Sequence, residues 1–311
     1  MPSHRIRRRG ALWAALLLAA AILPGGNPAA ARPPAQTGFP QQAGFPRTEP
    51  VGSMGLSSPA VADLDGDGAL DVLAADSAGC VWAWTAPGVL RPGFPLMTSG
   101  SCAQATRINA PLAVGELDGD PQLEIVAGNR GPGTAPNQRG QVFAWNHDGS
   151  LLAGWPREMG WNAAFATGPA EITSVALADL TGDGRLEVLA GTSNNANLGR
   201  VGYDTAPNLY AWQADGRLVA GYPTWAGTAG IYGALGAADL QCDGSADVIV
   251  GRDHAYLHAY DSGADQFAAW PARTYLDPSR DTPGRDPALV FPIGAPALGD
   301  LDGRGGIEVV A

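Results

Sequence analysis

Carboxylates recur along the chain in short loops of one spacing, and that spacing suits metal binding. The first loop carries acids at positions 1, 3, 5 and 9, which are Asp63, Asp65, Asp67 and Asp71. A tight loop can turn alternate side chains inward onto one ion, while position 7 contributes its backbone carbonyl. Oxygen ligands suit a hard cation, and a flexible loop suits Ca²⁺ better than Mg²⁺. The loop therefore predicts a calcium site.

Four more loops repeat this pattern, spaced about 60 residues apart. The candidate ligands of the second and third loops are Glu116, Asp118, Asp120, Glu124, Asp179, Thr181, Asp183 and Glu187. Those of the fourth and fifth loops are Asp239, Gln241, Asp243, Asp247, Asp300, Asp302 and Glu308. Asp and Gly are also good turn formers without any metal. Five copies in register favour metal loops over simple turns.

The five loops are not equal in charge, and ligand charge helps to set calcium affinity. We expect the first two loops to bind most tightly. The third and fourth loops carry Thr181 and Gln241 at position 3 and should bind more weakly. In the fifth loop Arg304 stands at position 5, where it could satisfy the acids without a metal.

Apolar residues at positions 2 and 8 of every loop should pin it to the body of the protein. Position 2 is always Leu, as in Leu64 and Leu117. The last acid stands at position 9 rather than 12, and a β-rich run follows it rather than a helix. An EF-hand is therefore excluded.

Each acidic loop belongs to a longer unit of four short segments. A strand-like run follows the loop, as in Val81-Trp-Ala-Trp84, and a turn such as Asp148-Gly149 comes next. A motif of the type Gly93-Phe-Pro95 closes the unit as its outermost strand. The recurring aromatic residues of the third segment, of which Trp84 is the first, should lie in the core between units.

The repeated unit predicts an all-β fold, a β-propeller whose four-stranded blades carry calcium-binding loops between strands A and B. The chain should form an incomplete ring of about four and a half blades, since residue 311 falls inside strand B of the fifth. Gly44-Phe-Pro46 precedes the first acidic loop and is interpreted as an outer strand that closes the ring.

The chain should divide into a signal peptide (residues 1–31), an N-terminal segment with the ring-closing strand (32–57) and the blades (58–311). Residues 1–31 combine a basic start, a short apolar run and the small residues Ala29-Ala30-Ala31. They predict a secreted protein, extracellular or periplasmic, and no later segment is long and apolar enough for a membrane span. The net charge of −11 argues against nucleic-acid binding. Many of the acids responsible stand at ligand positions.

Three cysteines follow the predicted signal peptide. Cys80 and Cys102 fall on the same face of the predicted fold, so a bridge between them is compatible with an oxidising compartment. Cys242 is left over inside the fourth acidic loop. His254 and His258 lie four residues apart, without a third nitrogen or sulfur ligand nearby, which argues against zinc.

The repeated unit resembles the FG-GAP (VCBS-type) repeat, which forms the blades of the integrin α-subunit propeller and of many secreted bacterial proteins. The resemblance covers about residues 38–311 and is carried by the acidic loops with their flanking strands, as in Val61-ADLDGDGALDVLAA. It implies calcium in the A–B loops on one face and a ligand on the opposite face. No enzyme signature accompanies the repeats.

Two long loops, 129–140 and 192–207, enlarge the face opposite the acidic loops and are rich in Gly, Asn and Arg. Aromatic residues predicted on the same face are Trp161, Phe165, Trp225, Tyr232 and Tyr275. They could contact a glycan or a protein ligand, or they could simply fill the propeller channel.

The leading hypothesis is a secreted calcium-binding propeller that acts as a recognition or adhesion module. One alternative is a propeller-fold polysaccharide lyase or hydrolase, which the sequence favours less. Its acid and base residues could come from Asp277, Arg280, Asp281, Arg285 and Asp286. A second alternative is a structural domain of a larger extracellular protein.

Overall fold

The computed structural model describes the repeated units and little of the chain before them. The described residues are 43–45, 47–48, 52, 57–102, 106–131, 139–159, 171–193, 207–224, 226, 230–231, 233–251, 256–273 and 295–310. All of them lie in one compact unit, Gln42–Ala311. The expected signal peptide lies outside the described residues, as does most of the segment 32–57.

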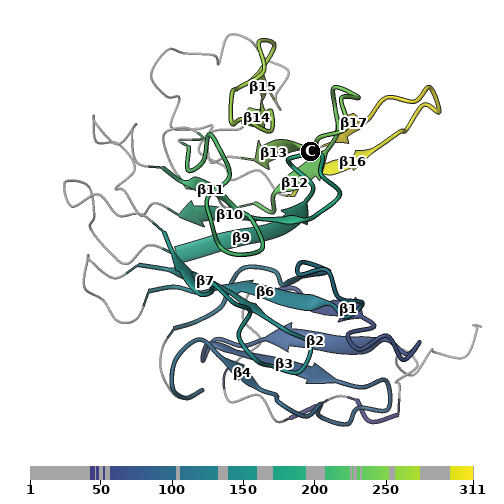
Figure 1. Ribbon diagram of the computed structural model, residues 1–311, viewed down its shortest axis with the longest axis vertical. Coiled ribbons are helices and arrows are strands. Elements are labelled where there is room, and N and C mark those ends of the chain that lie inside the picture. The colour runs from purple at the N-terminus through teal and green to yellow at the C-terminus, as the bar shows by residue number, and fades with distance from the viewer. Residues whose placement is uncertain are drawn as a thin grey trace, which may run out of the picture. The chain divides into compact units, whose positions relative to one another are not determined.

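Strands and turns make up the described residues, which contain no helix, so the expected all-β class is confirmed. Figure 1 shows the strands gathered in separate antiparallel sheets. The first sheet contains β1 (Ala60–Ala62), β2 (Asp71–Ala75), β3 (Cys80–Trp84) and β4 (Leu96–Met97). The second sheet contains β5 (Ala113–Gly115), β6 (Glu124–Gly128), β7 (Gln141–Trp145) and β8 (Arg157–Glu158). The third sheet contains β9 (Glu171–Ala178), β10 (Glu187–Ser193) and β11 (Leu209–Trp212). The fourth sheet contains β12 (Gly236–Ala238), β13 (Asp247–Gly251), β14 (Tyr256–Tyr260) and β15 (Ala272–Arg273). The fifth is β16 (Ala297–Gly299) with β17 (Glu308–Val310).

The sheets agree with the expected four-strand unit, with two differences in detail. The third sheet has three strands, and its outer strand is reduced to a single bridge between Leu209 and Thr224. In the closing motifs the proline stands just before the outer strand rather than within it, so that β4 begins directly after Pro95. Proline cannot donate a ladder hydrogen bond, which explains this position.

The apolar core lies between successive sheets rather than inside any one of them. One cluster joins Leu73 and Val81 of the first sheet to Ile125 and Trp145 of the second. Comparable clusters join the second sheet to the third, the third to the fourth and the fourth to the fifth. Three of the repeated aromatic residues belong to this core, as expected: Trp145, Trp212 and Tyr260. The first of the set, Trp84, is buried on the first sheet against Phe45.

The closing motifs bring each sheet against the turn of the next. A Cβ on Gly93, whose φ is +84°, would lie 2.2 Å from the carbonyl oxygen of Asp148 in the second sheet's turn. Gly44, with φ of +89°, approaches the carbonyl oxygen of Pro87 in the first sheet's turn in the same way. Phe45 then packs edge-on against Trp84, with ring centroids 6.4 Å apart. Only glycine tolerates this combination of backbone angle and close approach.

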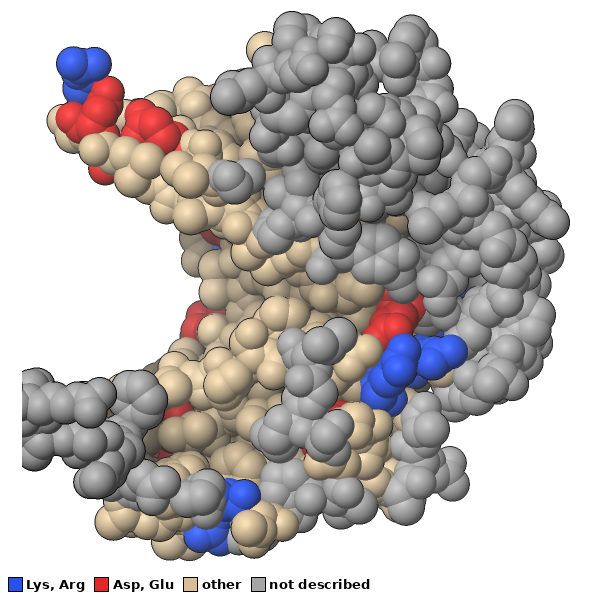
Figure 2. All heavy atoms as spheres, turned by 180° about the vertical axis from the view of Figure 1, so that it is seen from behind, with Lys and Arg blue, Asp and Glu red and all other residues tan. Residues whose placement is uncertain are grey.

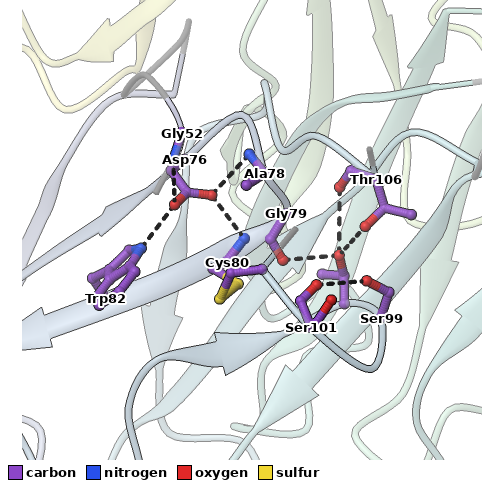
Figure 3. Close-up of a disulfide and its surroundings, with 11 residues drawn as sticks. Gly52, Asp76, Ala78, Gly79, Cys80, Trp82, Ser99, Ser101 and Thr106 are labelled. Carbon is purple, nitrogen blue, oxygen red and sulfur yellow. Dashed lines mark hydrogen bonds between the residues drawn. A yellow bond between two sulfur atoms is a disulfide. The ribbon is translucent and has the colours of Figure 1, made fainter. Parts of the chain in front are cut away.

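A disulfide joins Cys80 at the start of β3 to Cys102, with the Cα atoms 5.5 Å apart, so the expected pairing is confirmed. The buried Asp76 carboxylate beside it accepts hydrogen bonds from the backbone N–H groups of Ala78 and Cys80 and from the indole N–H of Trp82 (Figure 3). These contacts fix the turn between β2 and β3. Among the described residues, no helix is long and apolar enough to cross a membrane.

Candidate metal centre

The five acidic loops share one hydrogen bond that fixes their last acid. In each loop the backbone N–H of the Leu at position 2 donates to the carboxylate at position 9. The donor and acceptor pairs are Leu64 and Asp71 (3.3 Å), Leu117 and Glu124 (2.6 Å), Leu180 and Glu187 (2.7 Å), Leu240 and Asp247 (2.8 Å), and Leu301 and Glu308 (2.7 Å). This bond uses one carboxylate oxygen and leaves the other to face the loop.

The acid at position 1 organises the turn itself. Asp63 accepts hydrogen bonds from the backbone N–H groups of Gly66, Asp67 and Gly68. Asp179, Asp239 and Asp300 accept equivalent bonds in their own loops. The loops are therefore wound tightly by their own backbone, with the acids at positions 1 and 9 already oriented.

The second loop fits a cation best. Carboxylate oxygens of Glu116, Asp118 and Glu124 lie within 4.8 Å of one another. Glu124 is fully buried, and its Oε1 has no hydrogen-bond partner among the described residues. Burial raises the pKa of Glu124 to about 7, against the lowering effect of the Leu117 N–H, and the neighbouring acids raise it further. A buried carboxylate oxygen without a partner is costly, and a bound cation would remove that cost.

The first loop already holds a positive charge. The Arg91 guanidinium donates to Asp71 Oδ2 from Nη1 and to Asp65 Oδ2 from Nη2, each at 2.7 Å. The hydrogen bond from Arg91 is also the main reason that the pKa of Asp65 is lowered. Oxygens of Asp63, Asp65 and Asp67 converge within 4.8 Å. All four expected ligands of this loop are therefore near the site, but two of them are paired with a guanidinium.

In the third and fourth loops a neutral side chain takes the place of the ion. The Thr181 hydroxyl donates to Glu187 Oε1 at 3.3 Å, and the Gln241 amide donates to Asp247 Oδ1 at 3.4 Å. Burial raises the pKa of Glu187 and of Asp247. The described residues of these two loops form no cluster of three acidic ligands. A neutral donor at position 3 therefore relieves the buried acid without a metal.

The fifth loop, at the tip of the β16–β17 hairpin, is the most exposed. This hairpin stands at the upper right of Figure 1, and Figure 2 shows acidic and basic atoms together at its tip. Oxygens of Asp300, Asp302 and Glu308 converge within 4.8 Å. Arg304 is 85% exposed and reaches only Asp302, at 3.2 Å. It therefore lies at the edge of the cluster rather than among the three acids.

Most apolar residues at positions 2 and 8 pack against the body of the protein as expected, whereas Leu70 of the first loop and Leu301 and Ile307 of the fifth are exposed. Leu117 and Leu180 at position 2 are buried, and Leu123 and Leu186 at position 8 pack against the preceding sheet. Leu70, at position 8 of the first loop, is 58% exposed. No sheet precedes the first one among the described residues, which explains the exposure of Leu70.

A cleft of about 390 Å³ separates the second and third loops. Its lining includes Leu117, Asp118 and Leu152 from the second sheet and Asp183, Arg185 and Glu187 from the third. Both signs of charge therefore face this space, and Leu152 lies on the same wall as the candidate ligand Asp118.

The opposite face is described only at its base. The five aromatic residues predicted there lie outside the described residues, as do most of loops 129–140 and 192–207. Asn129 is buried, and its side chain accepts a hydrogen bond from the Gln141 N–H, so it closes the loop rather than facing a ligand. Nearby, Arg107 and Asn109 both donate to the Glu171 carboxylate. Of the two histidines, His258 is buried beside Tyr260, and His254 lies outside the described residues.

Sequence reasoning missed Arg91, which the structure places inside the first loop. The backbone N–H of Arg91 donates to the Ala83 carbonyl, just as the backbone N–H of Leu152 donates to the Ala144 carbonyl. Aligning the closing motifs would have shown a charge where the second unit has Leu. That comparison is the signal that could have found it.

Comparison with protein families identifies an FG-GAP-like repeat at residues 116–190. This segment runs from the first ligand of the second loop into β10, and the resemblance expected from the acidic loops is confirmed there. A comparison with curated proteins found no match.

Among solved structures, the V. cholerae biofilm matrix protein Bap1 matches with a TM-score of 0.49 and 17% identity, over 86% of this chain and 37% of that one. The C-terminal domain of Pseudomonas aeruginosa PilY1 matches with a TM-score of 0.44 and 14% identity, over 72% of this chain and 52% of that one. A europium-containing methanol dehydrogenase matches with a TM-score of 0.44 and 14% identity, over 68% of this chain and 41% of that one. The chain thus spans about half of those chains or less.

Proposed function

We propose that this chain forms calcium-binding blades of a secreted β-propeller that serves as a recognition or adhesion module for an extracellular glycan or protein. Calcium orders acidic loops between the first two strands of a blade, and the second loop is the strongest candidate site. The face opposite these loops is then free to contact the partner.

The observation that carries the calcium part is the second loop. Glu124 presents a buried oxygen without a partner to a site that Glu116 and Asp118 also reach. Hard oxygen ligands and an excess of negative charge select a divalent cation such as Ca²⁺. When bound, the ion supplies charge neutralisation and rigidity, and no catalytic step is assigned to it.

Packing between sheets supports a propeller. Each inner sheet buries its faces against its neighbours, whereas the first and fifth sheets expose apolar side chains such as Val61 and Leu301. Gly44 and Phe45 lie against the first sheet as the later closing motifs lie against the following sheets. This arrangement supports the interpretation of the N-terminal segment as the outer strand of a preceding blade.

Thermal unfolding tests the calcium proposal most directly. A ligand of the native state raises its stability, by about 2.7 kcal/mol at a concentration one hundred times its Kd. We expect Ca²⁺ to raise the unfolding midpoint and a chelator to lower it, with little response to Mg²⁺. An unchanged midpoint in Ca²⁺ and in chelator would reject the proposal.

Binding to arrays of extracellular glycans, with and without Ca²⁺, tests the recognition part. We expect retention of a glycan or protein ligand in calcium and no release of shortened or unsaturated sugars. Turnover of a polysaccharide would instead favour the lyase or hydrolase alternative.

A further inference from the structure

Arg91 reaches into the first acidic loop from a segment 20 residues further along the chain. Its guanidinium bridges Asp65 at position 3 and Asp71 at position 9. The side chains of Arg91 and Asp71 are only 10% and 4% exposed, so the pair is shielded from water. Removing one partner of such a pair is costly, because the other charge would then be buried without compensation.

In the following three sheets, an apolar residue stands at the position that corresponds to Arg91. The backbone N–H of Arg91 donates to the carbonyl of Ala83 in β3. The amides of Leu152, Val219 and Phe267 make the same bond in the following three sheets. Arg91 is thus a charged replacement at a position that otherwise packs in the core, and its register aims it at the acidic loop.

The second loop shows what the same site looks like without that charge. Leu152 stands where Arg91 stands, and Glu124 Oε1 has no partner. The first and second loops have four candidate acidic ligands each, but among the described residues only those of the first form ion pairs with an arginine. The two loops therefore differ at a residue outside the ligand pattern.

We infer that the Arg91 guanidinium is the resident cation of the first loop, which consequently holds its shape without calcium and leaves the second loop as the tightest metal site. This inference rests on the proposed calcium function of the loops. A guanidinium does not lose its proton in a protein and cannot dissociate, so it stays when free calcium falls. An ion entering this loop would have to displace it.

The rest of the first sheet is also held by metal-free contacts. The Cys80–Cys102 disulfide ties its third strand to the following segment. The Asp76 carboxylate fixes the turn between its second and third strands (Figure 3). Within the acidic loop Arg91 pairs with Asp65 and Asp71, and backbone N–H groups donate to Asp63 and Asp67.

Reciprocal substitutions test the inference by calcium titration calorimetry on the full chain. Arg91→Leu copies the second blade and should create an additional tight site, raising affinity at the first loop about ten-fold or more. Leu152→Arg copies the first blade and should remove the tight site of the second loop. Arg139→Leu, at an arginine paired with Glu158 of β8, is the matched control and should leave the isotherm unchanged.

The outcomes separate this inference from the calcium proposal itself. One outcome is that the wild-type chain has a tight calcium site, that Leu152→Arg abolishes it, and that Arg91→Leu gains no further calcium site. This outcome would overturn the inference but not the proposed function. Absence of calcium binding in both the wild-type chain and Arg91→Leu would overturn the proposed function.

A crystal of the wild-type chain grown in calcium needs no variant. We expect an ion in the second loop, with the contact between Arg91 and Asp71 retained in the first. An ion held by Asp63, Asp65 and Asp67, with Arg91 displaced, would overturn the inference.

Discussion

The backbone N–H of Leu117 donates a 2.6 Å hydrogen bond to Oε2 of Glu124, while Oε1 of the same buried carboxylate has no partner among the described residues. The loop thus orients a charge without neutralising it. The free protein gives up stability at this site, and we expect a bound cation to restore it.

Glu124→Gln should stabilise the metal-free protein and abolish its response to calcium. The amide keeps the shape of the side chain and can still accept the Leu117 hydrogen bond, but it removes a buried charge beside Asp118. We expect the free energy of unfolding without metal to rise by about 1–3 kcal/mol. Denaturant unfolding with chelator and with Ca²⁺ measures both effects. Glu158→Gln, at an exposed residue of β8, is the control and should keep the calcium response.

The pKa of Glu124 gives calcium binding a pH dependence. Because the pKa of about 7 in the folded state exceeds the ordinary 4.5, the folded metal-free chain keeps a proton that the unfolded chain has lost. Its stability should therefore fall as the pH rises from about 4.5 to about 7. Calcium must displace the same proton, so its affinity at pH 6 should be about ten-fold weaker than at pH 8. Titrations at the two pH values measure this, and equal affinities would contradict it.

Removing the disulfide should weaken the first sheet without changing the metal sites. The bridge closes a segment of 22 residues, so the double variant Cys80→Ala with Cys102→Ala should lose about 2–4 kcal/mol. Calorimetric unfolding measures the loss. The affinity of the second loop for calcium should stay the same, and a change there would show that the two features are coupled.

Cys242 stands at position 4 of the fourth loop with φ of +57°, where the other loops have Gly66, Gly119, Gly182 and Gly303 at positive φ. Its side chain is exposed and is not in a disulfide. Cys242→Gly should therefore stabilise the chain by about 0.5–1 kcal/mol, by removing a Cβ from a left-handed backbone position. Cys242→Ala keeps the Cβ and should give no such gain in denaturant unfolding.

Phe45 should contribute to the stability of the first sheet despite its distance from it along the chain. Its ring meets Trp84 edge-on, so Phe45→Ala should cost about 1–2 kcal/mol and change tryptophan fluorescence. Val89→Ala, at an exposed residue of the adjacent turn, is the control. Equal stability of both variants would argue against the ring-closing role of the N-terminal segment.

Local features of the fold could be predicted from the sequence because they repeat. The spacing of Asp63, Asp65 and Asp67 predicts a wound loop, and alternation in Val81-Trp-Ala-Trp84 predicts a buried strand. A contact that occurs in only one unit leaves no repeated pattern and could not be predicted in this way. Arg91 is such a contact, since its partner Asp71 lies in another segment and the aligned closing motifs show only that a charge replaces an apolar residue. The exposure of Leu70 likewise depends on which sheet stands beside it, and a repeat pattern carries no such information.

Neighbouring acidic loops are also joined through their backbones. The Leu123 N–H, next to the candidate ligand Glu124, donates to the carbonyl of Leu64 in the first loop, and the Ala246 N–H donates to that of Asp179 in the third. An ion that orders one loop therefore restrains the main chain of the next, and by linkage the restraint acts equally in the other direction. Because Arg91 holds the first loop without a metal, the bond from Leu123 to Leu64 braces the main chain beside Glu124 even when free calcium is low.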